Sequence, residues 1–169
     1  MANHILLISK LGEEIPISYS GAPILNENNE IIGVVIVFRN QVEERKVQKA
    51  LSNSAENFKA VTENANDAII VLQVDGTHVF VNRRMSEITG YSIQEIYANG
   101  IKGYAHPDEI PKLTDRIKRR LAGEDVPNQY ETMLINKQGV TVPVEITASK
   151  SLWQGQPADV VVLRDITKR

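Results

Sequence analysis

The sequence contains no cysteine. Disulfides, thiolate nucleophiles, cysteine-ligated metals and a cysteinyl–flavin adduct are therefore excluded. Long apolar runs are also missing, because the longest ones (31–38 and 160–163) fall far below the ~20 residues of a membrane-spanning helix. The N-terminus lacks the basic and apolar regions of a signal peptide. We therefore expect a cytoplasmic segment that does not enter a membrane.

The chain has little excess charge of either sign, with a net charge of −2. Nucleic acids and anionic lipid surfaces attract strongly basic proteins, so neither partner is indicated. The basic stretch of the second half is predicted to be an ordinary solvated helix face. It comprises Lys112, Arg116, Lys118, Arg119 and Arg120.

Motifs for catalysis and metal binding are absent as well. There is no Gly-x-Ser-x-Gly nucleophile elbow, no P-loop and no dinucleotide-binding glycine motif. The three histidines, His4, His78 and His106, do not share a helix face or form a cluster at metal-ligand spacing. We predict no catalytic residue, no metal site and no enzymatic activity in this chain. His78 follows a turn and is predicted to lie on the surface.

The sequence nearly repeats itself once. Residues 6–25 resemble residues 133–152 at a constant offset of 127, and after a two-residue slip residues 37–40 match residues 162–165. The identical pairs in the first stretch include Lys10 and Lys137, Gly12 and Gly139, and Pro16 and Pro143. Repeats of this kind indicate repeated structural units. Because strands and helices precede only the second copy, the pattern predicts the back end of one module, a connector and one whole module.

The first segment, residues 1–41, reads as three antiparallel strands without a helix. Such a sheet exposes an apolar face, which needs cover from a partner chain, from the connector or from residues upstream. Pro16, like its counterpart Pro143, falls inside an alternating strand although proline cannot donate to the hydrogen-bond ladder. An edge-facing or bulged position is predicted for both prolines.

Residues 42–64 are rich in charge and contain no glycine or proline, which predicts a helix. Apolar and small side chains recur at spacings of three and four, as in a coiled-coil seam. They are Val47, Ala50, Leu51, Ser54, Phe58 and Val61. Two interpretations are open: an amphipathic helix packed on its own domain, or a parallel contact between two copies of the chain. In the second, Val47, Leu51 and Phe58 form the dimer seam.

Residues 65–169 predict an α+β domain, in which a five-stranded antiparallel sheet carries helices on one face. The pattern gives two strands, then short helices, then three strands. The expected strands are 68–74, 78–82, 128–136, 140–150 and 157–167. Gly90 is expected to end the first short helix and Ser92 to cap the second. The longer helix is expected to begin with Pro107 in its first turn.

Several stretches of the second module, taken in order, resemble the PAS domains, which are sensor modules of signalling kinases and cyclases. They cover about residues 56–169. They are Glu63-Asn64-Ala65-Asn66-Asp67-Ala68-Ile69, Val74-Asp75-Gly76, Val79-Phe80-Val81-Asn82, Thr89-Gly90-Tyr91-Ser92, His106-Pro107-Asp108-Glu109, Asn136-Lys137-Gln138-Gly139 and Arg164-Asp165-Ile166-Thr167. Residues 6–45 then resemble the last strands of an upstream PAS domain. That copy departs from the family pattern because Arg39-Asn40-Gln41-Val42 replaces Arg-Asp-Ile-Thr.

The resemblance implies a sensory module that dimerises through its connector helix and PAS surfaces and relays a signal to an output domain in the same polypeptide. A histidine kinase of a two-component system is the expected parent. The implied relay residues are Arg164, Asp165, Ile166 and Thr167. Candidates to line a ligand pocket between sheet and helices are Met85, Ile88, Leu113, Ile117, Met133 and Ile135.

The same six residues also suit a plain hydrophobic core, and no ligand is identified by the sequence. A dimerising spacer that senses nothing is therefore the competing hypothesis. A PAS sensor with haem, or with flavin that forms no adduct, is a further alternative.

Overall fold

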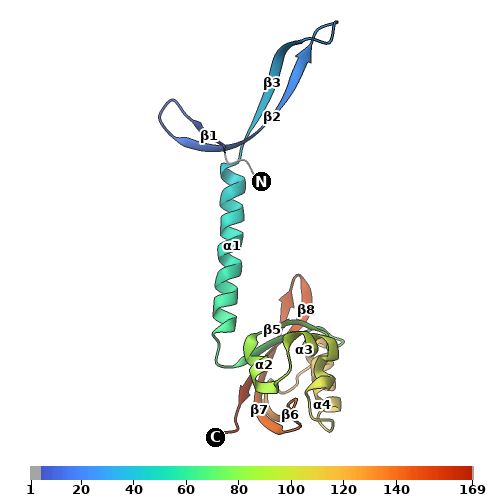
Figure 1. The fold of residues 1–169 in the computed structure, drawn as a ribbon. Coiled ribbons are helices and arrows are strands. Elements are labelled where there is room, and N and C mark those ends of the chain that lie inside the picture. The colour runs from blue at the N-terminus through green and yellow to red at the C-terminus, as the bar shows by residue number, and fades with distance from the viewer. Residues whose placement is uncertain (1–4, 169) are drawn as a thin grey trace. The chain divides into compact units, whose positions relative to one another are not determined.

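The computed structural model describes residues 5–168, so His4 lies outside the described residues. The chain divides into two units after Phe58, and each unit has its own antiparallel sheet. The first unit contains strands β1 (Ile5–Ile8), β2 (Glu14–Leu25) and β3 (Ile31–Asn40), which lie in that order in the sheet (Figure 1). Helix α1 (Val42–Glu63) follows β3 directly. The predicted three strands and connector helix are confirmed.

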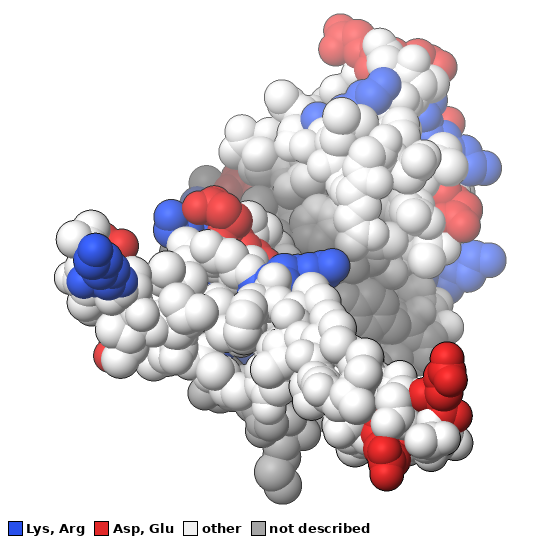
Figure 2. Space-filling view, turned by 90° about the horizontal axis from the view of Figure 1, so that it is seen from above, with Lys and Arg blue, Asp and Glu red and all other residues white. Residues whose placement is uncertain are grey.

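Apolar side chains of the first sheet are largely exposed. Ile17 is buried, whereas Ile31, Val34 and Phe38 are 68%, 59% and 57% exposed. Figure 2, a view from above, shows that uncharged side chains make up much of the visible surface. The predicted exposed apolar face is therefore present in this unit.

The second unit is a five-stranded sheet with helices over one face (Figure 1). The sheet order is β5-β4-β8-β7-β6, and all pairings are antiparallel. The strands are β4 (Ala68–Leu72), β5 (His78–Val81), β6 (Gln129–Ile135), β7 (Thr141–Trp153) and β8 (Gln156–Asp165). The helices are α2 (Arg83–Thr89), α3 (Ile93–Asn99), the 3-10 helix η1 (Gly100–Gly103) and α4 (Ile110–Ala122). The predicted α+β architecture is confirmed.

Local signals fix the short helices between β5 and β6. Gly90 ends α2 with a φ of 73°. The Ser92 hydroxyl accepts a hydrogen bond from the Glu95 amide, and the Glu95 carboxylate accepts one from the Ser92 amide. Both predicted boundaries are confirmed. The start of α4 was predicted wrongly, because Pro107 precedes the helix and Pro111 occupies its first turn. Proline is tolerated there because the first amides of a helix have no intrahelical partner.

The core of the second unit lies between the helices and the inner face of its sheet. Apolar residues of the central strands, such as Ile70, Val144 and Leu163, pack there against Met85 of α2 and Leu113 of α4. All five are at most 3% exposed. Their burial explains the helical spacing of the α4 side chains and the alternation along β7.

The two sheets share the same strand register, which confirms the internal repeat. Leu6 faces Pro16 as Met133 faces Pro143, and Ile17 faces Asn40 as Val144 faces Asp165. The strand pairing has no bulge at either proline. Each lies one residue beyond the end of the pairing with the following strand, and its carbonyl points to that side. The donor that proline lacks therefore faces no paired strand there, in agreement with the predicted edge-facing position.

Candidate functional site

Four of the predicted pocket residues meet in the core of the second unit. Met85, Ile88, Leu113 and Ile117 are 0%, 8%, 3% and 4% exposed and belong to one hydrophobic cluster.

Met133 and Ile135 were placed on the wrong face of β6. Thr132 and Leu134 point inward, and Met133 is 44% exposed. Side chains alternate along a strand, so an error of one residue exchanges the two faces.

An interior cavity in this core has a volume of about 20 Å³. Leu113 and Ile117 line it, together with Ile101, Tyr104 and the carboxylate-bearing Asp159. A cavity of this size holds about one water molecule. The residues in this arrangement therefore do not fit a haem or a flavin. Among the described residues, no three His, Asp or Glu side chains are grouped so that they could hold a metal ion.

His78 is buried in this core, contrary to the predicted surface position. It is 4% exposed, and its Nε2 lies 2.7 Å from the hydroxyl of Tyr104, which is 2% exposed. Desolvation lowers the pKa of His78 to about 4 and raises the pKa of Tyr104. The imidazole is therefore neutral near pH 7, and the histidine tautomer decides whether Nε2 or the Tyr104 hydroxyl donates in this hydrogen bond.

Arg120 is also buried, although the sequence predicted a solvated position on α4. Its guanidinium donates to Asp159 Oδ2 at 2.6 Å and to the carbonyl of Pro127 at 2.8 Å. Burial raises the pKa of Asp159, and the neighbouring Arg120 opposes that rise. The pair fastens α4 to β8 inside the core, which the spacing of charges along α4 did not reveal.

The C-terminal end of β8 carries the predicted relay residues. The Asp165 carboxylate accepts hydrogen bonds from the amide of Thr167, at 2.9 Å, and from its hydroxyl. These bonds hold the pKa of Asp165 below its ordinary value. The amide of Ile166 donates to the carbonyl of Pro143 at 3.1 Å. Together the contacts close a turn that directs the chain away from the sheet.

The last strand of the first unit, β3, ends in an equivalent turn. The amide of Gln41 donates to the carbonyl of Pro16 at 2.9 Å, and the amide of Val42 donates to Asn40 Oδ1 at 2.9 Å. Asn40 therefore does what Asp165 does in the second copy, because either side chain offers an oxygen to an amide two residues on. In the first copy α1 begins directly at Val42. The departure from Arg-Asp-Ile-Thr leaves the junction intact.

The entry to the second unit lies next to its exit. Arg164, the last residue but one of β8, donates from Nη2 and Nε to the two carboxylate oxygens of Asp67, at 2.9 Å and 3.3 Å. Asp67 precedes β4, so this ion pair joins the first strand of the sheet to the end of the last one. Arg164 also lies 4.0 Å from a carboxylate oxygen of Glu145 on β7.

Asn82 joins the end of α1 to Asp67 and to the start of β4. Its Nδ2 donates to the carbonyl of Thr62 at 2.8 Å and to that of Asp67 at 3.2 Å, while its Oδ1 accepts from the amides of Ile69 and Met85. The side chain is fully buried. The sequence pattern predicted no role for Asn82 beyond its place in a family motif. Its position between a strand and a helix is the available signal, because asparagine there can cap the helix.

The predicted seam of α1 is open to solvent. Val47, Leu51, Phe58 and Val61 are 67%, 63%, 46% and 73% exposed. No helix in the described part of the chain is long and apolar enough to cross a membrane.

Comparison with known proteins agrees with this architecture. Residues 56–166 match the profile described as PAS fold, and residues 2–43 match one described as PAS domain. A methyl sulfide methyltransferase-associated sensor of Methanosarcina acetivorans is 21% identical over 171 residues, which cover 87% of this chain. The matched region spans only 17% of the length of that relative.

Two solved structures resemble the fold. The PAS domain of an HTR-like protein from Haloarcula marismortui is 25% identical, with a TM-score of 0.60 over 72% of this chain and 99% of that one. A domain of a sensory box sensor histidine kinase/response regulator from Geobacter sulfurreducens is 22% identical, with a TM-score of 0.56 over 68% of this chain and 96% of that one. Profile, fold and neighbours agree: the chain belongs to the PAS domain family.

Proposed function

We propose that this chain is a sensory relay module that passes a conformational change from α1 to the end of β8. The observation that carries the proposal is the position of Asp67, which touches both ends of the route. Its carbonyl accepts from Asn82, which also holds Thr62 of α1, and its carboxylate holds Arg164 at the end of β8. A displacement at the end of α1 therefore changes the contacts of the exit strand.

The module acts as a dimer in this proposal, with α1 as the contact between two copies. Val47 and Leu51 support it, because they are about two-thirds exposed and spaced as in a coiled-coil seam. Pairing places both apolar side chains out of water. A change in this pairing is the input that the route through Asp67 transmits.

The output domain lies in the same polypeptide, and a histidine kinase is the proposed parent. PAS domains are typically non-catalytic sensory modules. A solved neighbour comes from a sensor histidine kinase, and the relative from Methanosarcina acetivorans is a much longer sensor protein. The turn at Asp165 would then start a helix toward the output domain, as the equivalent turn at Asn40 starts α1.

A dimerising spacer is the second candidate, and the small interior cavity favours it. At about 20 Å³, the cavity offers no room for a ligand larger than water in this arrangement. A spacer would hold two copies together without changing the turn at Asp165.

Leu51→Glu tests the seam that both candidates share, because it places a charge in that seam. We expect the variant to weaken the dimer by about tenfold or more, equivalent to about 1.4 kcal/mol or more, measured by analytical ultracentrifugation. Asn53→Glu introduces the same charge on the other side of α1 and should leave the dimer unchanged. A wild-type chain that is monomeric would overturn the seam in both candidates.

The relay is tested in the same variant through the amide signals of Ile166 and Thr167 in ¹⁵N-resolved NMR spectra. If α1 is coupled to β8, Leu51→Glu shifts both signals. Adding Arg164→Gln should abolish the shift, whereas adding Arg119→Gln, which removes an exposed guanidinium that does not contact Asp67, should not. Unchanged amides after the dimer is lost would leave the spacer as the function.

A further inference from the structure

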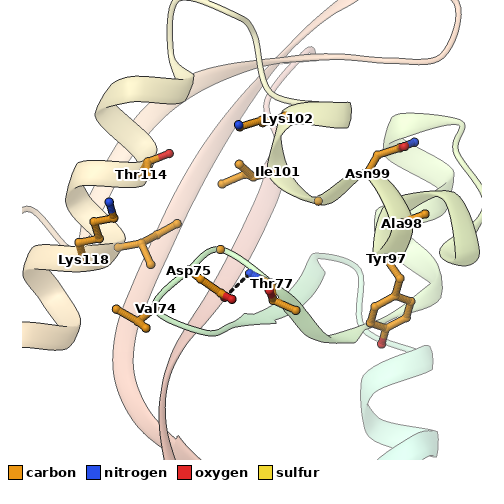
Figure 3. Close-up of a pocket in the computed structure, with 13 residues that line it drawn as sticks. Val74, Asp75, Thr77, Tyr97, Ala98, Asn99, Ile101, Lys102, Thr114 and Lys118 are labelled. Carbon is orange, nitrogen blue, oxygen red and sulfur yellow. Dashed lines mark hydrogen bonds between the residues drawn. The ribbon is translucent and has the colours of Figure 1, made fainter.

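A surface groove of about 510 Å³ lies between the β4–β5 turn, the segment joining α3 to η1, and α4 (Figure 3). This volume is within the range of small-molecule sites in proteins. Lys102 from η1 and Lys118 from α4 line it together with Thr114. Figure 3 shows both lysines reaching the opening between η1 and α4. Residues 74–77 form the side opposite η1.

The two lysines differ from most cations of the second unit. Among the described residues, neither has an ion-pair partner. By contrast, ion pairs hold Arg83, Arg84, Lys112, Arg119, Arg120, Lys137 and Arg164. The acidic residue of the groove, Asp75, is not paired with the lysines and accepts the amide of Thr77 at 2.9 Å. Two ammonium groups and one carboxylate thus line the groove, and the excess of one positive charge favours an anion there.

Besides the lysines, the groove has apolar side chains as well as the polar Asp75, Thr77, Asn99 and Thr114. Val74 and Tyr97, which are 56% and 43% exposed, line it together with Ile101 and Ile117. Ile101 and Ile117 also line the interior cavity of the core. Ile101 and Ile117 therefore separate the groove from the core. A ligand that packs against these two side chains contacts the wall of the core without entering it.

We propose that this groove binds an organic carboxylate with an apolar body. The carboxylate lies between Lys102 and Lys118, and the body packs on Val74, Tyr97 and Ile101. Because the two lysines and Asp75 leave an excess of one positive charge, a carboxylate with a single charge suits the groove better than a phosphate, which carries close to two negative charges near pH 7. The bound ligand would contact Ile101 and Ile117, which separate the groove from the core. Only this last consequence for signalling rests on the proposed relay.

The test uses the full chain, labelled with ¹⁵N, and octanoate as the probe. We expect saturable shifts in the amides of residues 100–102 and 114–118, with half-saturation below about 5 mM. Acetate carries the charge without the body, and octanol carries the body without the charge, so each should bind more weakly. Octanol binding as tightly as octanoate, or shifts spread over the whole surface, would overturn the proposal.

Lys102→Gln/Lys118→Gln should weaken octanoate binding about five- to tenfold, because two exposed charge contacts are lost. Lys46→Gln/Lys112→Gln removes the same charge outside the groove and should leave the affinity unchanged. Equal affinity in both double variants would rule out the site. If octanoate binds at the groove but does not shift the amides of Ile166 and Thr167, the site stands and its link to the relay is refuted.

Discussion

The side-chain amide of Asn82 donates to the carbonyl of Thr62 at 2.8 Å, and so fixes the last turn of α1 to the start of α2. The same side chain accepts the amide of Ile69 on β4 at 2.9 Å. One buried residue therefore joins the incoming helix, the first strand and the first helix of the PAS core. This makes Asn82 the structural centre of the entry to that core.

Asn82→Ala is expected to destabilise the second unit by about 2–4 kcal/mol, since it removes a helix cap and leaves buried backbone groups unpaired. Trp153 is the single tryptophan of the chain and lies in this unit, so its fluorescence during urea unfolding measures the loss. Asn53→Ala on the exposed surface of α1 is the control. A loss below about 0.5 kcal/mol would contradict the anchoring role, because that is the range of neutral surface changes.

Asp165→Ala should open the turn after β8, whereas Asp165→Asn should keep it. The reason is that Asn40 forms the equivalent bond to Val42 in the first copy with an amide oxygen. Hydrogen exchange of the Thr167 amide is the measurement, with faster exchange expected in the alanine variant alone. In the parent protein, Asp165→Ala should uncouple input from output. Fast exchange in both variants would show that the turn needs the negative charge.

The buried His78 predicts a loss of stability in mild acid. Its pKa is about 4 in the folded protein and 6.5 ordinarily, so below pH 6.5 the unfolded chain binds a proton that the folded one does not. Stability from this group is full above pH 6.5 and falls as the pH approaches 4, by at most about 3 kcal/mol.

The measurement compares urea unfolding of the wild type and His78→Gln at pH 7 and pH 4.5. Glutamine retains a polar nitrogen near Tyr104 but does not titrate in this range. Between pH 7 and pH 4.5, we expect the unfolding free energy of the wild type to fall more than that of the variant. Parallel pH curves would mean that His78 has the same pKa in the folded and the unfolded chain, which would contradict the prediction.

Breaking the Arg120–Asp159 pair on one side should cost more than removing both partners. Arg120→Met leaves the carboxylate buried without its cation, at a cost of about 3–5 kcal/mol. Arg120→Met/Asp159→Leu should be more stable than the single variant, because no unpaired charge remains. Thermal unfolding followed by circular dichroism compares them, with Arg119→Met as the exposed control. A double variant less stable than Arg120→Met would contradict the prediction, because the unpaired carboxylate would then cost less than its replacement by leucine.

The sequence by itself determined the order of elements, the repeat, the PAS family and the connector helix. Those features rest on local patterns: alternation in β7, the helical spacing around Leu113 and the turn residues at Gly90 and Ser92. Helical periodicity also predicted the apolar stripe that contains Val47 and Leu51. Only the structure showed that this stripe is exposed, because the sequence equally suited packing against its own domain.

Only the tertiary structure decided which polar residues are buried and which distant ones meet. Periodicity does not show that Arg120 finds Asp159, that His78 finds Tyr104 or that Arg164 reaches Asp67, because these pairs are brought together by the order of strands in the sheet. The structure also decided which face of β6 points inward. The predicted alternation was wrong by one residue, so Met133 lies on the outer face. Burial of a polar group depends on its partner in space, and a single sequence does not display that partner.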